Sequence, residues 1–221
     1  MLMVVLAFAG AGYLLYFFIF RASQAPGSTS MPPVVPESMD ALLQALEIEL
    51  NKHNPEIVQL LQPGITDEEL GQAETLLGQT IHLEMQALYR WHNGLREERE
   101  LFPGHGFWSL QYAIHMNHEV NQQYQEKGLG FLMAREEHWL VLFPDGAGDG
   151  YYYDRQRKYD TGGVFYNFRE AGYYRYFPSL KNLLKALLEC YQKGVYSQDS
   201  ETDFEIEDKI MNRYSLVVEQ N

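Results

Sequence analysis

The chain has 221 residues, 46% hydrophobic and 21% charged, which favours one globular core and excludes wholesale disorder. Thirty acidic against 17 basic residues give a net charge of -13, which argues against nucleic acids and anionic lipid headgroups as partners and favours a cationic one. The single cysteine, Cys190, excludes an intrachain disulfide and lies in a leucine-rich helical pattern that predicts core packing.

Residues 1–20 carry no charged side chain, and as a helix rising about 1.5 Å per residue they would cross a hydrocarbon core of about 30 Å. We interpret them as a single transmembrane anchor. Arg21 follows the apolar run, so the positive-inside rule predicts that the rest of the chain faces the cytoplasm. A cleaved signal peptide stays open as the alternative, because residues 23–25 supply the small side chains of a cleavage site.

Residues 21–38 are rich in proline and serine, a composition that cannot build a core and predicts an extended linker. Methionines inside and beside this linker leave a second possibility open. Translation from Met31 or Met39 would give a soluble chain without the anchor.

Residues 39–196 are predicted to form the globular domain, which opens with three helices. The first begins at Asp40 as N-cap. The second begins with a capping box at Thr66 and Glu69 and stops at Gly78, and the third spans residues 83–92 and ends at Asn93. The side chains predicted to face the core are Leu42, Leu43, Leu46, Leu50, Leu70, Ala73, Leu76, Leu77, Leu88 and Trp91.

The second half of the domain changes from helical to extended patterns. Ser109 is predicted to cap a helix that continues through Val120. A strong apolar stripe then predicts a last helix after Ser179, which ends at Gly194. Between these helices, β-prone segments predict antiparallel strands at residues 139–143, 151–153, 164–168 and 173–177.

The acidic tail, residues 197–221, leaves docking and disorder open as alternatives. An apolar face could pack one more amphipathic segment against the domain. The residues of that face are Phe204, Ile206, Ile210, Met211 and Tyr214.

Two groups of residues invite a catalytic or metal-binding interpretation. His115 and His118 stand three residues apart on a predicted helix, and residues 145–150 alternate aspartates with glycines. Zinc needs three or four ligands and the calcium loop needs a twelfth-position glutamate, and the sequence completes neither pattern. We therefore expect no metal, no cofactor and no catalysis, and keep a metal-dependent enzyme using His115, His118 and Asp149 as the alternative hypothesis.

Three stretches together resemble the SUKH superfamily of cell-wall assembly regulators and immunity proteins. Residues 64–78 are similar to its capped helix, residues 89–94 to its helix that closes in Asn-Gly, and residues 139–154 to its central hairpin. The positions that carry the resemblance are Glu69, Leu77, Gly78, Trp91, Asn93, Gly94, Gly148, Asp149 and Asp154.

The resemblance implies an α+β fold, in which helices pack on a curved, mainly antiparallel sheet, here preceded by the N-terminal transmembrane helix. It also implies a function in protein binding without catalysis, with a toxin or a component of wall synthesis as partner. Bacterial relatives are commonly antitoxins, so a start at Met31 or Met39 would suggest a soluble antitoxin. The residues expected to contact the partner are Asp145, Tyr151, Tyr153 and Tyr173.

Overall fold

A computed structural model describes residues 35–128, 138–146, 149–155, 163–168, 172–197 and 202–217, all within one structural unit, Pro33–Asn221. The predicted anchor at residues 1–20 and most of the 21–38 linker lie outside these residues. Within the described ranges, the helices are all too short or too polar to cross a membrane.

The domain begins with two helices, α2, Met39–His53, and α3, Pro55–Leu60. The first helix was predicted, but its N-cap is Ser38, whose hydroxyl accepts the Ala41 N–H at 3.2 Å. Asp40 instead lies in the first turn, where its negative charge suits the helix dipole. Helix α3 was not predicted, although Asn54 caps it and a proline opens it.

Helices α4, Asp67–Leu77, and α5, Leu83–Trp91, confirm the second and third predicted helices. The capping box of Thr66 and Glu69 is present, and Gly78 ends α4 with a φ of 65°. The prediction that Leu76 is buried was wrong, because this side chain is 73% exposed. At 100° per residue Leu76 lies about 120° around the helix from the buried Leu70, outside the stripe that packs.

The main sheet has five antiparallel strands in the order β3-β4-β5-β6-β7, so neighbours in sequence are neighbours in the sheet. The strands are Trp139–Pro144, Gly150–Asp154, Val164–Phe168, Gly172–Phe177 and Leu216–Val217. A second sheet pairs β1, Leu61–Pro63, with β2, His92–Leu95, also antiparallel. The four predicted strands are confirmed, whereas β1, β2 and β7 were missed.

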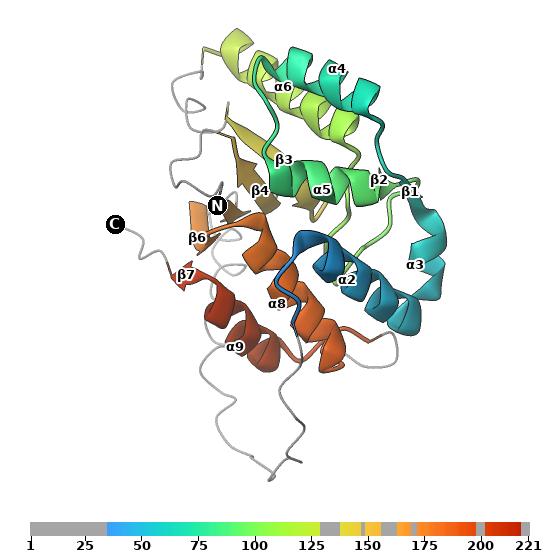
Figure 1. The fold of residues 1–221 in the computed structure, drawn as a ribbon. Coiled ribbons are helices and arrows are strands. Elements are labelled where there is room, and N and C mark those ends of the chain that lie inside the picture. The colour runs from blue at the N-terminus through green and yellow to red at the C-terminus, as the bar shows by residue number, and fades with distance from the viewer. Residues whose placement is uncertain are drawn as a thin grey trace, which may run out of the picture. The chain divides into compact units, whose positions relative to one another are not determined.

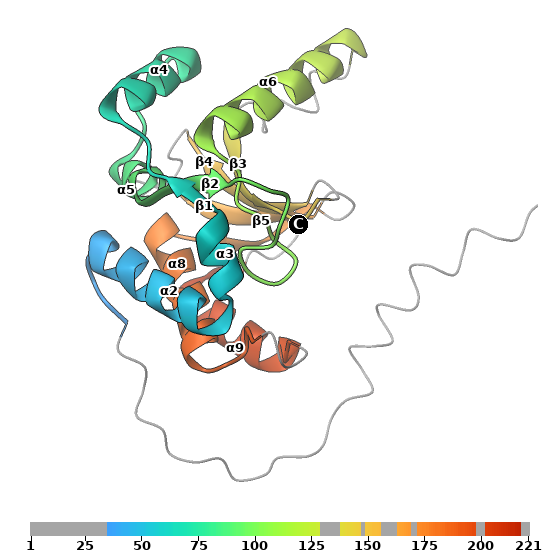
Figure 2. The same cartoon turned by 90° about the vertical axis from the view of Figure 1, so that its right-hand side faces the viewer.

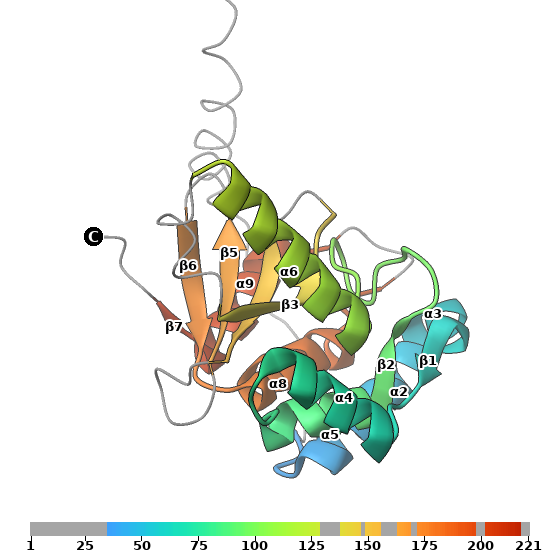
Figure 3. The same ribbon diagram turned by 90° about the horizontal axis from the view of Figure 1, so that it is seen from above.

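The helices surround the sheet on several sides. Helix α6, Leu110–Glu126, is capped by Ser109 as predicted and crosses over β3 (Figure 3). Helix α8, Leu180–Gln192, lies beside α2 (Figure 1). Helices α4 and α6 gather at one end of the domain, and α9, Phe204–Tyr214, lies at the other (Figure 2). This arrangement confirms an α+β fold with antiparallel sheets and helices.

Alternation along the strands decides which side chains enter the core. Leu140, Tyr153 and Val164 stand opposite one another on adjacent strands, and all three are buried. Helix α8 contributes the longest apolar stripe, which includes Cys190 as predicted. Residues from both halves of the chain therefore close one continuous core.

The acidic tail docks over residues 204–217. Ile210 and Met211 are buried against the core, and β7 pairs with β6 at the edge of the sheet. Phe204 and Ile206 remain exposed, so of the five apolar residues these two do not pack against the domain. The docked face is narrower than the five apolar residues suggested, and the first turn of α9 is held by the hydrogen bond that Glu207 accepts from the Tyr196 hydroxyl.

Glu189 on α8 is a buried carboxylate that binds α9 through hydrogen bonds. It is 2% exposed and accepts hydrogen bonds from the Tyr214 hydroxyl at 2.8 Å and from Arg213, while Lys193 lies at 2.8 Å. Burial raises the pKa of Glu189, but the hydrogen bonds from Lys193, Tyr214 and Arg213 outweigh it, so the pKa lies below its ordinary value of 4.5. The ionised carboxylate therefore stabilises the docked tail.

Replacing Glu189 with glutamine should lower the free energy of unfolding by about 2 kcal/mol at pH 7, because the charge-assisted bonds to α9 are lost. Since the folded-state pKa is lowered, this stabilisation is present above pH 4.5 and disappears as the pH falls through the folded-state value. Urea unfolding from pH 3 to pH 7 measures both effects.

The matched control is Glu205→Gln, which removes an exposed carboxylate paired with Lys209 at 2.7 Å and should leave stability unchanged. Equal unfolding midpoints for Glu189→Gln and the unaltered chain at pH 7 would show that the network does not hold the tail.

Candidate recognition surface

The segment from Trp91 to Gly94 joins three elements of the domain. The side-chain oxygen of Asn93 accepts the Leu110 N–H at 2.9 Å, and its amide donates to Gln111 at 2.9 Å, so Asn93 binds the first turn of α6. The indole N–H of Trp91 donates to Glu47 on α2 at 2.8 Å. These polar side chains bind within the domain rather than present a surface to a partner.

Gly94 lies where two stretches of backbone almost touch. Its φ is 81°, and a Cβ atom there would come within 2.4 Å of the Ser109 nitrogen. The next residue, Leu95, donates its N–H to the Phe107 carbonyl at 2.9 Å. Only glycine fits this approach without displacing backbone. We call residues 92–95 together with residues 107–110 the Asn-Gly junction.

The hairpin positions of the family-like pattern also bind within the chain. The Asp145 carboxylate accepts the Asp149 N–H at 2.9 Å, which closes the turn between β3 and β4. The half-buried Asp154 lies at the end of β4, opposite Trp139. Gly148 lies outside the described residues. The Asp145 carboxylate therefore serves the turn, as a carboxylate does in an Asx-turn.

The tyrosines expected to contact a partner divide into two cases. Tyr151 and Tyr153 are only 4% and 3% exposed, so they belong to the core and are not part of a contact surface. They point inward because alternate residues of β4 face the interior. Tyr173 lies in β6, paired with Asn167, and its side chain lies outside the described part of the chain.

His115 and His118 are both exposed on α6, and Asp149 belongs to the turn after β3. Among the described residues, no group of three or more histidine, cysteine or acidic side chains is placed to hold a metal ion. Cys190 has its pKa raised to about 12 by burial, with the Glu207 charge adding to the effect, so its thiol stays protonated at neutral pH.

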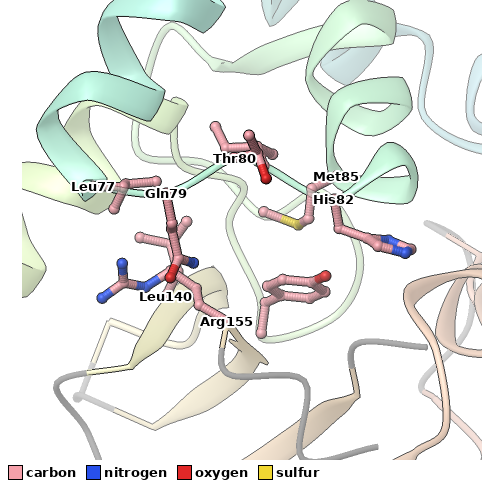
Figure 4. Close-up of a pocket in the computed structure, with 9 residues that line it drawn as sticks. Leu77, Gln79, Thr80, His82, Met85, Leu140 and Arg155 are labelled. Atoms are coloured by element: carbon pink, nitrogen blue, oxygen red, sulfur yellow. The ribbon is translucent and has the colours of Figure 1, made fainter. Parts of the chain in front are cut away.

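A small hollow brings two family-like stretches together between the α4–α5 connection and the sheet. Figure 4 shows Leu77 and Thr80 on one side of it and Leu140 and Arg155 on the other. Its volume of about 10 Å³ holds about one water molecule. The hollow is therefore a packing feature and too small for a substrate.

A larger groove, of about 160 Å³, lies where α2 and α8 both end. We call it the helix-end groove. Its lining residues are His53, Asn54, Glu100, Leu101, Phe102, Pro103, Tyr191, Tyr196 and Ser197. Local sequence patterns do not predict this groove, because its residues come from three separate segments. The one available signal was the pair of tyrosines on either side of Gly194.

Beside this groove, His105 packs into a cluster of aromatic rings. Its ring centroid lies 4.8 Å from that of Phe102 and 5.1 Å from that of Tyr151. Burial lowers the pKa of His105 below its ordinary value, although its hydrogen bond to the Pro103 carbonyl and the nearby carboxylates of Asp145 and Glu100 act against this. The neutral ring thus supports the wall that carries Phe102.

Replacing Gly94 with alanine should destabilise the domain by about 3 kcal/mol, because the new Cβ meets backbone at a positive φ. Gly78→Ala is the matched control, since Gly78 also has a positive φ but open space around its Cβ position. That variant should cost only about 1 kcal/mol. Thermal and urea unfolding compare the two, and equal losses would contradict a structural role specific to the junction.

Comparison with known proteins agrees with the resemblance in the sequence. The chain matches the SMI1 / KNR4 family (SUKH-1) over residues 64–186, a range that contains the Asn-Gly junction, the hollow and the first four strands of the main sheet. No curated protein sequence matches it significantly. The matched range covers more than half of the chain and the order of its elements is the expected one, so the chain belongs to the SMI1 / KNR4 (SUKH-1) family.

Proposed function

We propose that this protein is a non-enzymatic recognition domain of the immunity or cell-wall-regulator type, which binds a cationic protein while residues 1–20 tether it to a membrane. The observation that carries the proposal is membership of the SUKH-1 family over residues 64–186.

The charge distribution supports a cationic partner. The net charge is -13, and the loop after β2 exposes Glu97, Glu98 and Glu100 to solvent. Further carboxylates are exposed at the start of α4 and on α9. Such a surface speeds the approach of a basic protein and repels acidic ones.

Affinity capture of the full chain from its own cells, in mild detergent, should retain a basic protein. The purified partner should then bind with a Kd that weakens at least tenfold between about 50 and 300 mM salt, because exposed charges are screened. Calorimetry at the two salt concentrations measures this. Failure to retain any protein, or an affinity independent of salt, would contradict the proposal.

Expression of the captured partner alone separates the two family roles. A partner that stops growth, and whose effect the full chain suppresses on co-expression, supports immunity. A harmless partner that belongs to the machinery of wall synthesis supports regulation.

The tether is tested by extracting membranes with alkaline carbonate. The full chain should stay in the membrane pellet, because an apolar run of 20 residues is long enough to span the bilayer. A variant that begins at Met39 should appear in the soluble fraction. Release of the full chain by carbonate would count against an anchor.

A further inference from the structure

We infer that the helix-end groove receives one basic side chain of the protein partner, an arginine in particular. This inference rests on the proposed function, because it names the partner's chemistry at one point of contact. The groove has about 160 Å³, below the roughly 300 Å³ at which pockets for small molecules begin. Its size suits a single anchoring side chain, and such anchors carry much of the energy of protein interfaces.

The carboxyl end of helix α8 makes the groove favourable for a positive charge. Helix α2 ends at His53 and α8 ends at Gln192, and the two run side by side to the same end of the domain (Figure 1). The carboxyl end of a helix carries a partial negative charge from its unsatisfied carbonyl groups. The end of α8 therefore favours a cation bound there, whereas the end of α2 meets the start of α3 at Asn54 and contributes little.

Glu100 adds a full negative charge at the rim. Its carboxylate accepts the Gly104 N–H at 2.8 Å, and among the described residues no basic side chain lies within ion-pair distance of it. The basic side chains nearby already have acidic partners: Lys52 pairs with Glu49 at 2.8 Å, and Arg99 with Glu56 at 3.9 Å. Glu100 is therefore the carboxylate in the groove that can pair with an incoming cation.

Two tyrosine rings complete the lining. Tyr191 and Tyr196 are 4% and 2% exposed, and their rings meet edge to face with centroids 5.2 Å apart. Both hydroxyls are engaged, that of Tyr191 with the Leu101 carbonyl at 2.7 Å and that of Tyr196 with Glu207. Burial raises the pKa of both phenols, so the rings stay neutral. Because so little of either ring is exposed, both rings bound the groove as part of the core and offer no free face to a cation.

Arginine fits this lining better than other side chains. An acidic side chain would meet Glu100 and the negative end of α8, and an apolar one would bury the Glu100 carboxylate without a partner. The planar guanidinium group can pair with a carboxylate through two parallel N–H donors, which an ammonium group does less well. A lysine is therefore expected to bind more weakly than an arginine.

The test titrates the full chain with N-acetyl-arginine amide and follows the backbone amides of Leu101 and Ser197 by NMR. We expect saturable shifts with a Kd on the order of millimolar, as for one small anchoring group. The neutral isostere N-acetyl-citrulline amide should bind at least tenfold more weakly. Equal shifts with citrulline, or shifts that do not saturate, would overturn the inference.

Two variants localise the effect. Glu100→Gln keeps an acceptor for the Gly104 N–H and should weaken binding of the arginine amide at least threefold, without a change in thermal stability. Glu98→Gln, an exposed position in the same loop, is the matched control and should bind as the unaltered chain does. Equal affinities for the two variants would overturn the inference.

The same variants separate this inference from the proposed function. If the full chain captures a partner and Glu100→Gln binds it as tightly as the unaltered chain, the groove inference fails while protein recognition stands. If no partner is captured but the arginine amide saturates the groove, protein recognition fails and the groove stands.

Discussion

The close backbone approach at Gly94 is the constraint on which the rest of the domain depends. The junction sets the end of α5 against the start of α6, and Asn93 binds the first turn of that helix from the side. The same backbone continues to the main sheet, because the Gly106 N–H donates to the Pro144 carbonyl at 2.8 Å. Asn93 and Gly94 thus fix the position of the small sheet against the start of α6, and Gly106 joins the same segment to the main sheet. A side chain at Gly94 would displace the backbone of residues 108 and 109.

This constraint explains why the family-like residues are poor candidates for partner contact. Their polar groups bind helix termini and turns, so the binding surface has to come from residues around them. The helix-end groove is such a surface, because it lies beside the structural residues and is not made of them. Its Glu100 wall lies inside the region that matches the family, whereas His53, Tyr191 and Tyr196 lie outside it. A shared scaffold with a groove built partly from flanking helices would let relatives keep the fold and differ in partner.

The sequence predicted the elements whose signals are local. Thr66 and Glu69 predict the start of α4, and Ser109 and Ser179 predict the starts of α6 and α8. These signals are readable because helix caps and apolar stripes involve residues only a few positions apart. Strands β1, β2 and β7 were missed because they have two to four residues and depend on distant partners. Tyr151 and Tyr153 were expected to contact a partner but are buried, because the sequence alone does not say which face of β4 the rest of the domain covers. The groove was beyond prediction, since the bond between Tyr191 and Leu101 spans 90 residues of sequence.

Hydrogen exchange on the full chain, alone and in complex with its captured partner, tests the central claim most directly. That claim is that the junction is scaffold and that the helix-end groove meets the partner. Exchange should slow on binding for the amides of residues 97–103 and 195–197, and should stay unchanged for residues 92–95, which are already held in the free protein. Protection centred on residues 92–95, with none around the groove, would contradict the account.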